Sequence, residues 1–549
     1  MAVNNRLSGF VLLVALFFSH SPQSVPAQNN SHDHAEAAAG MFPAELLERP
    51  VPIRTGTGAV YEAVTTSSKE AQAFYNQGLA YLHSYVWIEA ARSFNQSLRY
   101  DAKLAMSYVG LSRAFSGLNA YTAARAALER AQSLASLASE RERRLIGIRA
   151  RHLDAIADIG NVEKHFQYKK AIDDALAIDP KDVELWLMRG VAEEANAAGR
   201  GQHGGARSIQ FYEKALQLSP DNFAAHHYLT HSLENTDRIQ EALKHGEAYA
   251  RLSPAIPHAH HMYGHDLRRV GRVADAIAEF RRADELERAY YKSENIPSEY
   301  DWHHEHNLDL LSTSYQHEGR MKAAEELMRQ AFAIPSMQDT LEFNKKQWPE
   351  FLIARGRNEE ALAAANKLSE SRWDIVRAIG RISAAQAHLA MNNLPSASAE
   401  AKAALAELQA SGGRAAFVAG YIEALQGEFY LRTGQSEKGR ALLKQVAGKI
   451  RSEPGPDAWT QALFRLEALS RAARAAGDWE LAEYLARQMI DHDAAYAGSH
   501  YALALVAEQK KDTALALQEF AEAEKLWRNA DPDLPELQQT QARIAALKK

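Results

Sequence analysis

The stretch Gly271-Arg272-Val273-Ala274-Asp275-Ala276 decides how the chain folds, because close copies of it recur along the sequence. Asp237-Arg238-Ile239-Gln240-Glu241-Ala242 and Gly477-Asp478-Trp479-Glu480-Leu481-Ala482 have the same layout. In each copy a Gly or Asp ends one helix, and a second helix begins within a few residues, with an acidic side chain in its first turn. The final Ala marks the point where we expect the second helix to pack closely on its partner.

This Ala recurs at a regular interval along the chain. The pairs that show the interval are Ala90 and Ala124, Ala242 and Ala276, and Ala482 and Ala516. An aromatic residue stands four positions later in several copies, as Phe94, Phe280 and Phe520. A helix–turn–helix unit with this period and with small, aromatic and Pro positions is the tetratricopeptide pattern. The sequence therefore predicts about twelve such repeats between positions 70 and 530.

The composition supports an all-α fold. Ala, Leu, Glu, Arg and Gln dominate, and the alternation of β-branched residues that is typical of strands is almost absent. We expect a tetratricopeptide-type α-solenoid, a right-handed superhelix whose first helices line a concave groove. By analogy with such folds, this groove would bind a protein or peptide partner.

Charge and Cys content exclude several classes of protein. The 549 residues are 46% apolar and 24% charged and carry a formal net charge of −6, which gives no reason to expect a nucleic-acid partner. The absence of Cys removes disulfides, thiolate metal sites, Cys nucleophiles and the lipid-anchoring Cys of lipoproteins. Composition leaves the oligomeric state open.

The N-terminal segment 1–27 has the layout of a secretory signal peptide. An apolar run, Gly9–Ser19, is followed by the small residues of Val25-Pro26-Ala27. An N-terminal membrane anchor is the alternative, although the run is shorter than the ~20 apolar residues that span a bilayer. We expect an exported protein, periplasmic or secreted, without a membrane span in the mature chain. The predicted domains are a flexible segment (28–69), N-terminal repeats (70–222), His-rich repeats (223–335) and C-terminal repeats (336–549).

Histidine is concentrated in the third of these domains. Of the 22 His residues, 13 lie between His203 and His317, about a fifth of the chain. The residues His226, His227 and His231 recur one repeat later as His260, His261 and His265. Equivalent positions of two adjacent repeats therefore carry His.

Spacings of i, i+3 and i+7 place most of these side chains on the concave face of the first helices. The predicted metal ligands are His227, His231, His258, His261, His265 and His306, with Glu234, Arg268 and Asp309 beside them. Ring nitrogens and carboxylates without thiolates suit Zn, Cu, Fe, Mn or Ni. The alternative is that these His bind a peptide or acidic ligand without metal. Repulsion between like charges should keep their pKa values below about 6.5.

An insertion lies next to this His-rich face. The interval from Ala276 to Ala324 is longer than the repeat period, and the extra segment runs through Tyr300 and Trp302. Insertions in repeat arrays map to loops, often on the binding face. The aromatic residues would form a lid over the His groove, or alternatively cap an exposed helix end. No residue is assigned a catalytic role, and whether the protein is an enzyme stays open.

The motifs of residues 223–325 also support a metal site. They are His227-Tyr228-Leu229-Thr230-His231, then His258-Ala259-His260-His261-Met262-Tyr263-Gly264-His265, and a Tyr-rich stretch that ends in His306-Asn307. This region resembles a poorly characterised group of exported bacterial tetratricopeptide proteins with a His-x-x-His-Met-x-x-His motif. The resemblance implies a metal or small-ligand site without an established reaction. The chain departs from the group at Tyr263, where most relatives have Pro, and at Asp309, where many have a second His.

Overall fold

The computed structural model describes residues 42–410, 415–453 and 456–548. Those up to Ile296 form one compact unit, the N-terminal unit, and those from Pro297 onward form a second, the C-terminal unit. The predicted signal peptide and the first part of the segment that follows it lie outside these ranges. Within the described ranges, every helix is too short or too polar to cross a lipid bilayer.

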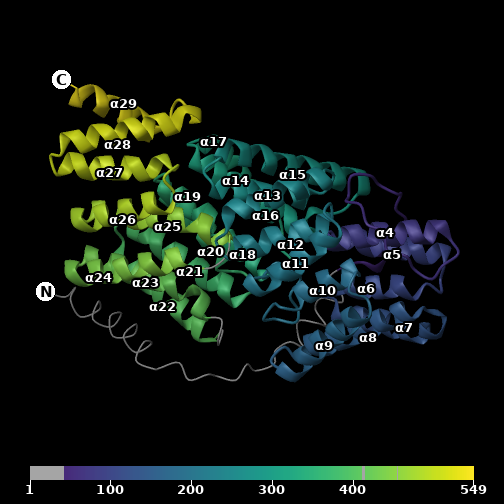
Figure 1. The fold of residues 1–549 in the computed structure, drawn as a ribbon. Coiled ribbons are helices and arrows are strands. Elements are labelled where there is room, and N and C mark those ends of the chain that lie inside the picture. Colours follow the sequence, from purple (N-terminus) through teal and green to yellow (C-terminus); the bar gives the residue numbers. More distant parts are fainter. Residues whose placement is uncertain (1–41, 411–414, 454–455, 549) are drawn as a thin grey trace. The chain divides into compact units, whose positions relative to one another are not determined.

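The N-terminal unit consists of six consecutive helix pairs preceded by one short helix (Figure 1). Its helices are α3 (Ala44–Glu48), α4 (Lys69–His83), α5 (Trp87–Tyr100), α6 (Ala105–Gly117), α7 (Tyr121–Ser133), α8 (Glu140–Ile156), α9 (Val162–Ile178), α10 (Val183–Val191), α11 (Ala206–Leu218), α12 (Phe223–Glu234), α13 (Ile239–Leu252), α14 (Pro257–Arg269) and α15 (Val273–Glu294).

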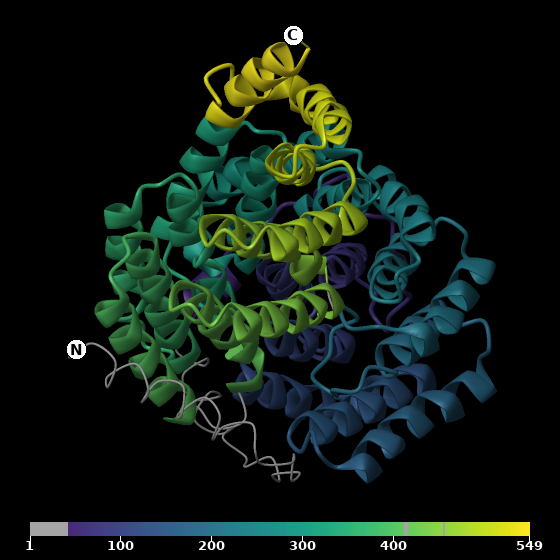
Figure 2. The same ribbon diagram turned by 90° about the vertical axis from the view of Figure 1, so that its left-hand side faces the viewer.

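The C-terminal unit contains six further pairs, and Figure 2 shows its later helices stacked in chain order up to the yellow C-terminal end. Its helices are α16 (Trp302–His317), α17 (Met321–Ala333), α18 (Asp339–Asn344), α19 (Gln347–Ala354), α20 (Asn358–Leu368), α21 (Asp374–Ala390), α22 (Leu394–Ala410), α23 (Ala415–Arg432), α24 (Ser436–Ser452), α25 (Pro456–Ala475), α26 (Trp479–His492), α27 (Ala497–Gln509), α28 (Thr513–Leu526) and α29 (Pro535–Leu547).

The anchor positions pack as predicted. The Ala of the quoted copies are completely buried, and so is the aromatic four residues later, as in Phe94 and Phe520. A small residue on the first helix makes room for this ring: a Cβ added at Gly264 would lie 2.7 Å from Cε1 of Phe280. Twelve consecutive helix pairs, several of them with this packing, confirm the all-α, tetratricopeptide-type fold.

The first helices face the interior of each unit, as predicted. In the N-terminal unit, side chains from α4, α6, α8, α10 and α12 line a cavity of about 60 Å³. In the C-terminal unit, α16, α19, α21, α23 and α25 line a cavity of about 240 Å³. The concave surface of each unit is therefore the place to look for ligand sites.

Residues 49–68, which the sequence analysis placed in a flexible segment, run along the N-terminal unit in extended form. The Arg54 main-chain N–H donates to the Gln77 side chain (2.7 Å), and the Ala255 N–H donates to the carbonyl of Gly56 (2.9 Å). This segment therefore links the first helix pair to a turn near the end of the same unit.

The insertion after Ala276 is helical up to Glu294, where the sequence analysis expected a loop. The extended α15 reaches the first helix pair: the Tyr290 hydroxyl donates to Glu89 of α5 (2.9 Å), and Glu294 pairs with Arg92 (2.9 Å). The first and last pairs of the N-terminal unit are thus in contact. The insertion contributes to this closure as a helix end rather than as a loop.

Candidate metal centre

Helices α12 and α14 position the His side chains. The Asn222 side chain caps α12 by accepting the Ala225 N–H (2.8 Å), and Pro257 occupies the first turn of α14. His227 and His231 lie one helical turn apart on α12, and His258 lies at the start of α14. All three are buried, with exposed fractions of 0, 7 and 3%.

Their Nε2 atoms converge. His227 Nε2 lies 3.2 Å from Nε2 of His231 and 3.0 Å from Nε2 of His258. We call these three residues the three-His cluster. One ring nitrogen from each lies within 4.8 Å of the others, so the three rings are close enough to share one metal ion.

The remaining nitrogen of His227 has a defined role. Nδ1 lies 2.6 Å from the carbonyl oxygen of His83, and because a carbonyl only accepts, Nδ1 carries the proton. In the neutral ring, Nε2 therefore carries a lone pair, and this lone pair is directed at the two other rings. Burial lowers the pKa of His227 to about 3, so this neutral form is the one present at pH 7. The predicted depression of the pKa is therefore confirmed for His227, but burial rather than repulsion is its main cause.

Tyr85 covers the three-His cluster from the turn between α4 and α5. Its ring centroid lies 4.5 Å from that of His227, 5.3 Å from that of His258 and 5.9 Å from that of His231. The Tyr85 hydroxyl donates to the carbonyl of Arg200 (2.7 Å). The concave surface is therefore covered here by the chain itself, and the open groove expected from the sequence is not present at this point.

The backbone of Tyr85 is left-handed, with φ of 60°. The equivalent turns of later repeats have Asn119, Asp237 and Gly271 in this conformation, residue types that tolerate it. A bulky aromatic residue there costs about 1–3 kcal/mol, and such strain is typical of functional sites. The alignment of Tyr85 with Asn119 one repeat later contains this signal in the sequence.

His261 and His265 form a separate pair on α14. Their Nε2 atoms are 3.0 Å apart, and Nδ1 of His265 lies 3.3 Å from Oε1 of Glu234. The Glu234 carbonyl also accepts a hydrogen bond from Arg269 (3.2 Å). The predicted neighbour Arg268 is buried on the same helix. A carboxylate on the second ring nitrogen is the usual partner of a metal-binding His, because it fixes the ring orientation.

The other predicted site residues belong to the C-terminal unit. His306 lies 3.7 Å from a carboxylate oxygen of Asp457, and its ring centroid lies 6.1 Å from that of Trp302. Tyr300 is the last residue of the short turn before α16. Asn307 lies within α16 and is completely buried. Asp309 accepts a hydrogen bond from Gln347 (2.8 Å), and its burial raises its pKa well above the usual value.

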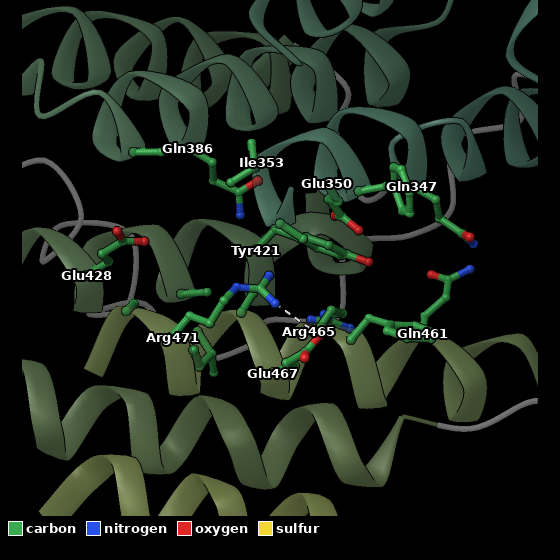
Figure 3. A pocket seen from close by; sticks show the side chains of 18 of the residues that line it. Gln347, Glu350, Ile353, Gln386, Tyr421, Glu428, Gln461, Arg465, Glu467 and Arg471 are labelled. Carbon is green, nitrogen blue, oxygen red and sulfur yellow. Dashed lines mark ion pairs between the residues drawn. The ribbon is translucent and has the colours of Figure 1, made fainter. Parts of the chain in front are cut away.

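The cavity of about 240 Å³ in the C-terminal unit is a second candidate ligand site (Figure 3). The Tyr421 ring lies at its centre, with the guanidinium of Arg465 4.1 Å from the ring centroid. Arg471 pairs with Glu467 (3.0 Å) at its lower edge. Four Gln side chains add amide groups to an otherwise mostly apolar lining: Gln316, Gln347, Gln386 and Gln461. The cavity is therefore suited to a ligand with both apolar and hydrogen-bonding parts.

No protein-family model matches the sequence, and no curated protein matches it. Three solved structures are similar in fold. The human IFIT1 dimer with PPP-AAAA is 14% identical over 77% of this chain and 91% of its own, with a TM-score of 0.40. Yeast Tom70 is 12% identical over 87% and 96%, with a TM-score of 0.32. The APC/C hetero-tetramer Cut9–Hcn1 is 12% identical over 88% and 97%, with a TM-score of 0.30. The fold assignment itself rests on the helix pairs and their regular spacing.

Proposed function

We propose that the protein binds a divalent transition metal ion through Nε2 of His227, His231 and His258. The observation that carries this proposal is the convergence of three buried Nε2 atoms on one point. Zn–N bonds of about 2.0–2.1 Å in a tetrahedral site place the ligand nitrogens about 3.3 Å apart. The distances of 3.0 and 3.2 Å within the cluster are close to that spacing.

Hydrogen bonding alone satisfies this arrangement poorly. His227 Nε2 has one lone pair, because its Nδ1 donates to the His83 carbonyl. The rings of His231 and His258 both approach that lone pair, and it can accept only one full hydrogen bond. A cation would instead take one lone pair from each of the three rings.

The ligand set indicates which ions are suitable. Imidazole nitrogens favour Zn, Cu, Ni and Fe over Mn, which prefers oxygen ligands. Three protein ligands also leave a coordination position for water or a substrate, as in catalytic zinc sites. The pair His261 and His265, with Glu234 behind it, offers two further ring nitrogens for a second ion.

Titration of the metal-free, full-length protein with Zn²⁺ and Co²⁺ tests the proposal. We expect saturable Zn²⁺ binding and the visible absorption of Co²⁺ in a nitrogen site. Replacing His227 by Asn should weaken binding by at least about tenfold, because one of three ligands is lost. The matched control is His260→Gln on α14. This ring bonds to Glu279 (2.7 Å) between the two helices of its repeat, and its loss should leave binding unchanged.

Equal affinity in the wild-type protein and His227→Asn would contradict the proposal. Circular dichroism separates this outcome from misfolding, since His227→Asn must keep the wild-type helix content for the comparison to count. If it does not, His231→Asn removes a second ligand from a more exposed position on the same helix, and the same criterion applies.

A second function, binding of a protein or peptide partner, is favoured by the C-terminal cavity. Gln347 Oε1 and Arg465 Nη2 are buried at its wall without a hydrogen-bond partner among the described residues. A peptide main chain could supply both an N–H and a carbonyl. The test is capture of a partner by the wild-type protein but not by Ala424→Arg, which fills the cavity. Equal capture by both proteins would contradict this second function.

We further propose that either function operates after export, on the basis of residues 1–27.

A further inference from the structure

Arg149 of α8 is a charged side chain in the interior of the N-terminal unit, only 2% exposed. Its guanidinium donates to the hydroxyl (2.9 Å) and carbonyl (2.7 Å) of Ser112, to the Ser116 hydroxyl and to His152 Nδ1 (2.9 Å). Both Ser lie in the second half of α6, whose dipole supplies about half a negative charge at its C-terminal end. These contacts satisfy N–H groups but do not balance a full positive charge.

The acidic residues around Arg149 are already paired. Within the described ranges, no carboxylate lies within 4.0 Å of its guanidinium. Glu184 pairs with Arg113 (2.6 Å) and His83 (2.9 Å), and Glu62 pairs with Arg141. A buried charge without a counter-charge is strongly unfavourable. Burial, together with the charge of Arg113, accordingly lowers the pKa of Arg149 to about 9.

Arg149 lines the cavity of about 60 Å³ in this unit. A single water needs about 10–15 Å³ of such space, so there is room for a small polyatomic ion. Tyr75 and Tyr168 also line the cavity and bring phenol groups to it. His83 and Tyr228, joined by a hydrogen bond of 3.0 Å, separate it from the three-His cluster.

We propose that this cavity binds a small oxyanion, a carboxylate or a phosphate group, whose negative charge pairs with Arg149. The site is distinct from the metal centre and goes beyond the proposed function. The unpaired guanidinium supplies the charge, and the phenol hydroxyls supply further donors. Of the cations that line the cavity, Arg113 is already neutralised by Glu184, so Arg149 determines the sign of the ligand.

The experiment measures the melting temperature of the full-length, metal-free protein against phosphate and acetate at constant ionic strength. We expect a saturable rise of about 3 °C once the ligand exceeds its Kd tenfold. Arg149→Gln should lose this rise. The matched control is Arg125→Gln, a half-exposed cation of the neighbouring helix α7 that pairs with Asp154, and it should keep the rise. A response to phosphate alone identifies a phosphate site, and a response to both ions identifies a general carboxylate and phosphate site.

The proposal is overturned if neither ion gives a saturable shift, or if Arg149→Gln responds like the wild-type protein. If Arg149→Gln does not fold, Arg149→Lys replaces it. Lysine keeps the charge but lacks the planar fork of arginine, so the affinity for the ion should fall about tenfold. Unchanged affinity in Arg149→Lys, measured by calorimetry, would then overturn the proposal.

Discussion

At the scale of single residues, Tyr85 has a strained backbone and covers the three-His cluster with its ring. Its left-handed backbone is unfavourable for an aromatic residue, yet its ring shields His227. We expect Tyr85→Asn to relieve the strain, keep the fold and expose the three-His cluster. The rate of metal release to a chelator should then rise about tenfold or more.

Stopped-flow mixing of the metal-loaded protein with a chromogenic chelator measures this rate. Tyr61→Asn is the control, because Tyr61 is 74% exposed and its loss should leave the rate unchanged. If Tyr85→Asn releases the metal no faster than the wild-type protein, Tyr85 does not protect the site.

Glu194 makes stability depend on pH. Burial raises its pKa to about 7, against a usual value of 4.5, even though its Oε1 accepts the N–H of His203 (3.0 Å). Because its pKa is raised in the folded state, Glu194 contributes to the stability of the protein at pH values below 4.5. This contribution is lost as the pH rises through 7. Glu194→Gln cannot ionise, so it should equal the wild-type protein at pH 4 and be more stable by about 3 kcal/mol at pH 8.5. Urea unfolding at both pH values measures this, and an equal pH dependence in the two proteins would refute it.

At the scale of elements, the fit between α14 and α15 holds the ligand helix in place. A Cβ at Gly264 would lie 2.7 Å from Phe280, closer than real contacts allow. Gly264→Ala should therefore destabilise the N-terminal unit by about 1–3 kcal/mol and weaken metal binding, because the same helix carries the ligand His258. Gly448→Ala on α24 meets no atom within 4 Å and should stabilise by about 0.5–1 kcal/mol.

Denaturant unfolding of both variants checks this prediction. If the Gly264→Ala protein is as stable as the wild type, α14 and α15 can move apart without loss of stability. The proposed role of their packing would then be refuted.

The elements themselves were largely predictable. Ala276 and Phe280 recur with the period of the repeat, and local patterns of this kind reflect the contacts within each helix pair. The length of α15 was not predictable in this way. Its extension to Glu294 is stabilised by Arg92 and by Tyr290 on Glu89, partners that are distant in sequence. Local helix propensity depends on neighbouring residues and therefore does not predict such contacts.

At the scale of the whole chain, the array divides into two units at Ile296, inside the region that the sequence analysis treated as one His-rich domain. The pattern of His residues predicts that His227, His231 and His258 lie together, because all three positions face the concave side of adjacent first helices, and the structure brings them together. It did not reveal that Tyr85, which lies four repeats before His227 and five repeats before His258, covers them. Pairing across the N-terminal unit depends on how its helix pairs curve, which no local stretch specifies.

Anomalous diffraction from crystals of the full-length protein grown with Zn²⁺, recorded on both sides of the zinc edge, would locate a bound ion directly. We expect an anomalous peak about 2.0–2.1 Å from Nε2 of His227, His231 and His258, beneath the ring of Tyr85. A fully zinc-saturated crystal without a peak at these three nitrogens would contradict it.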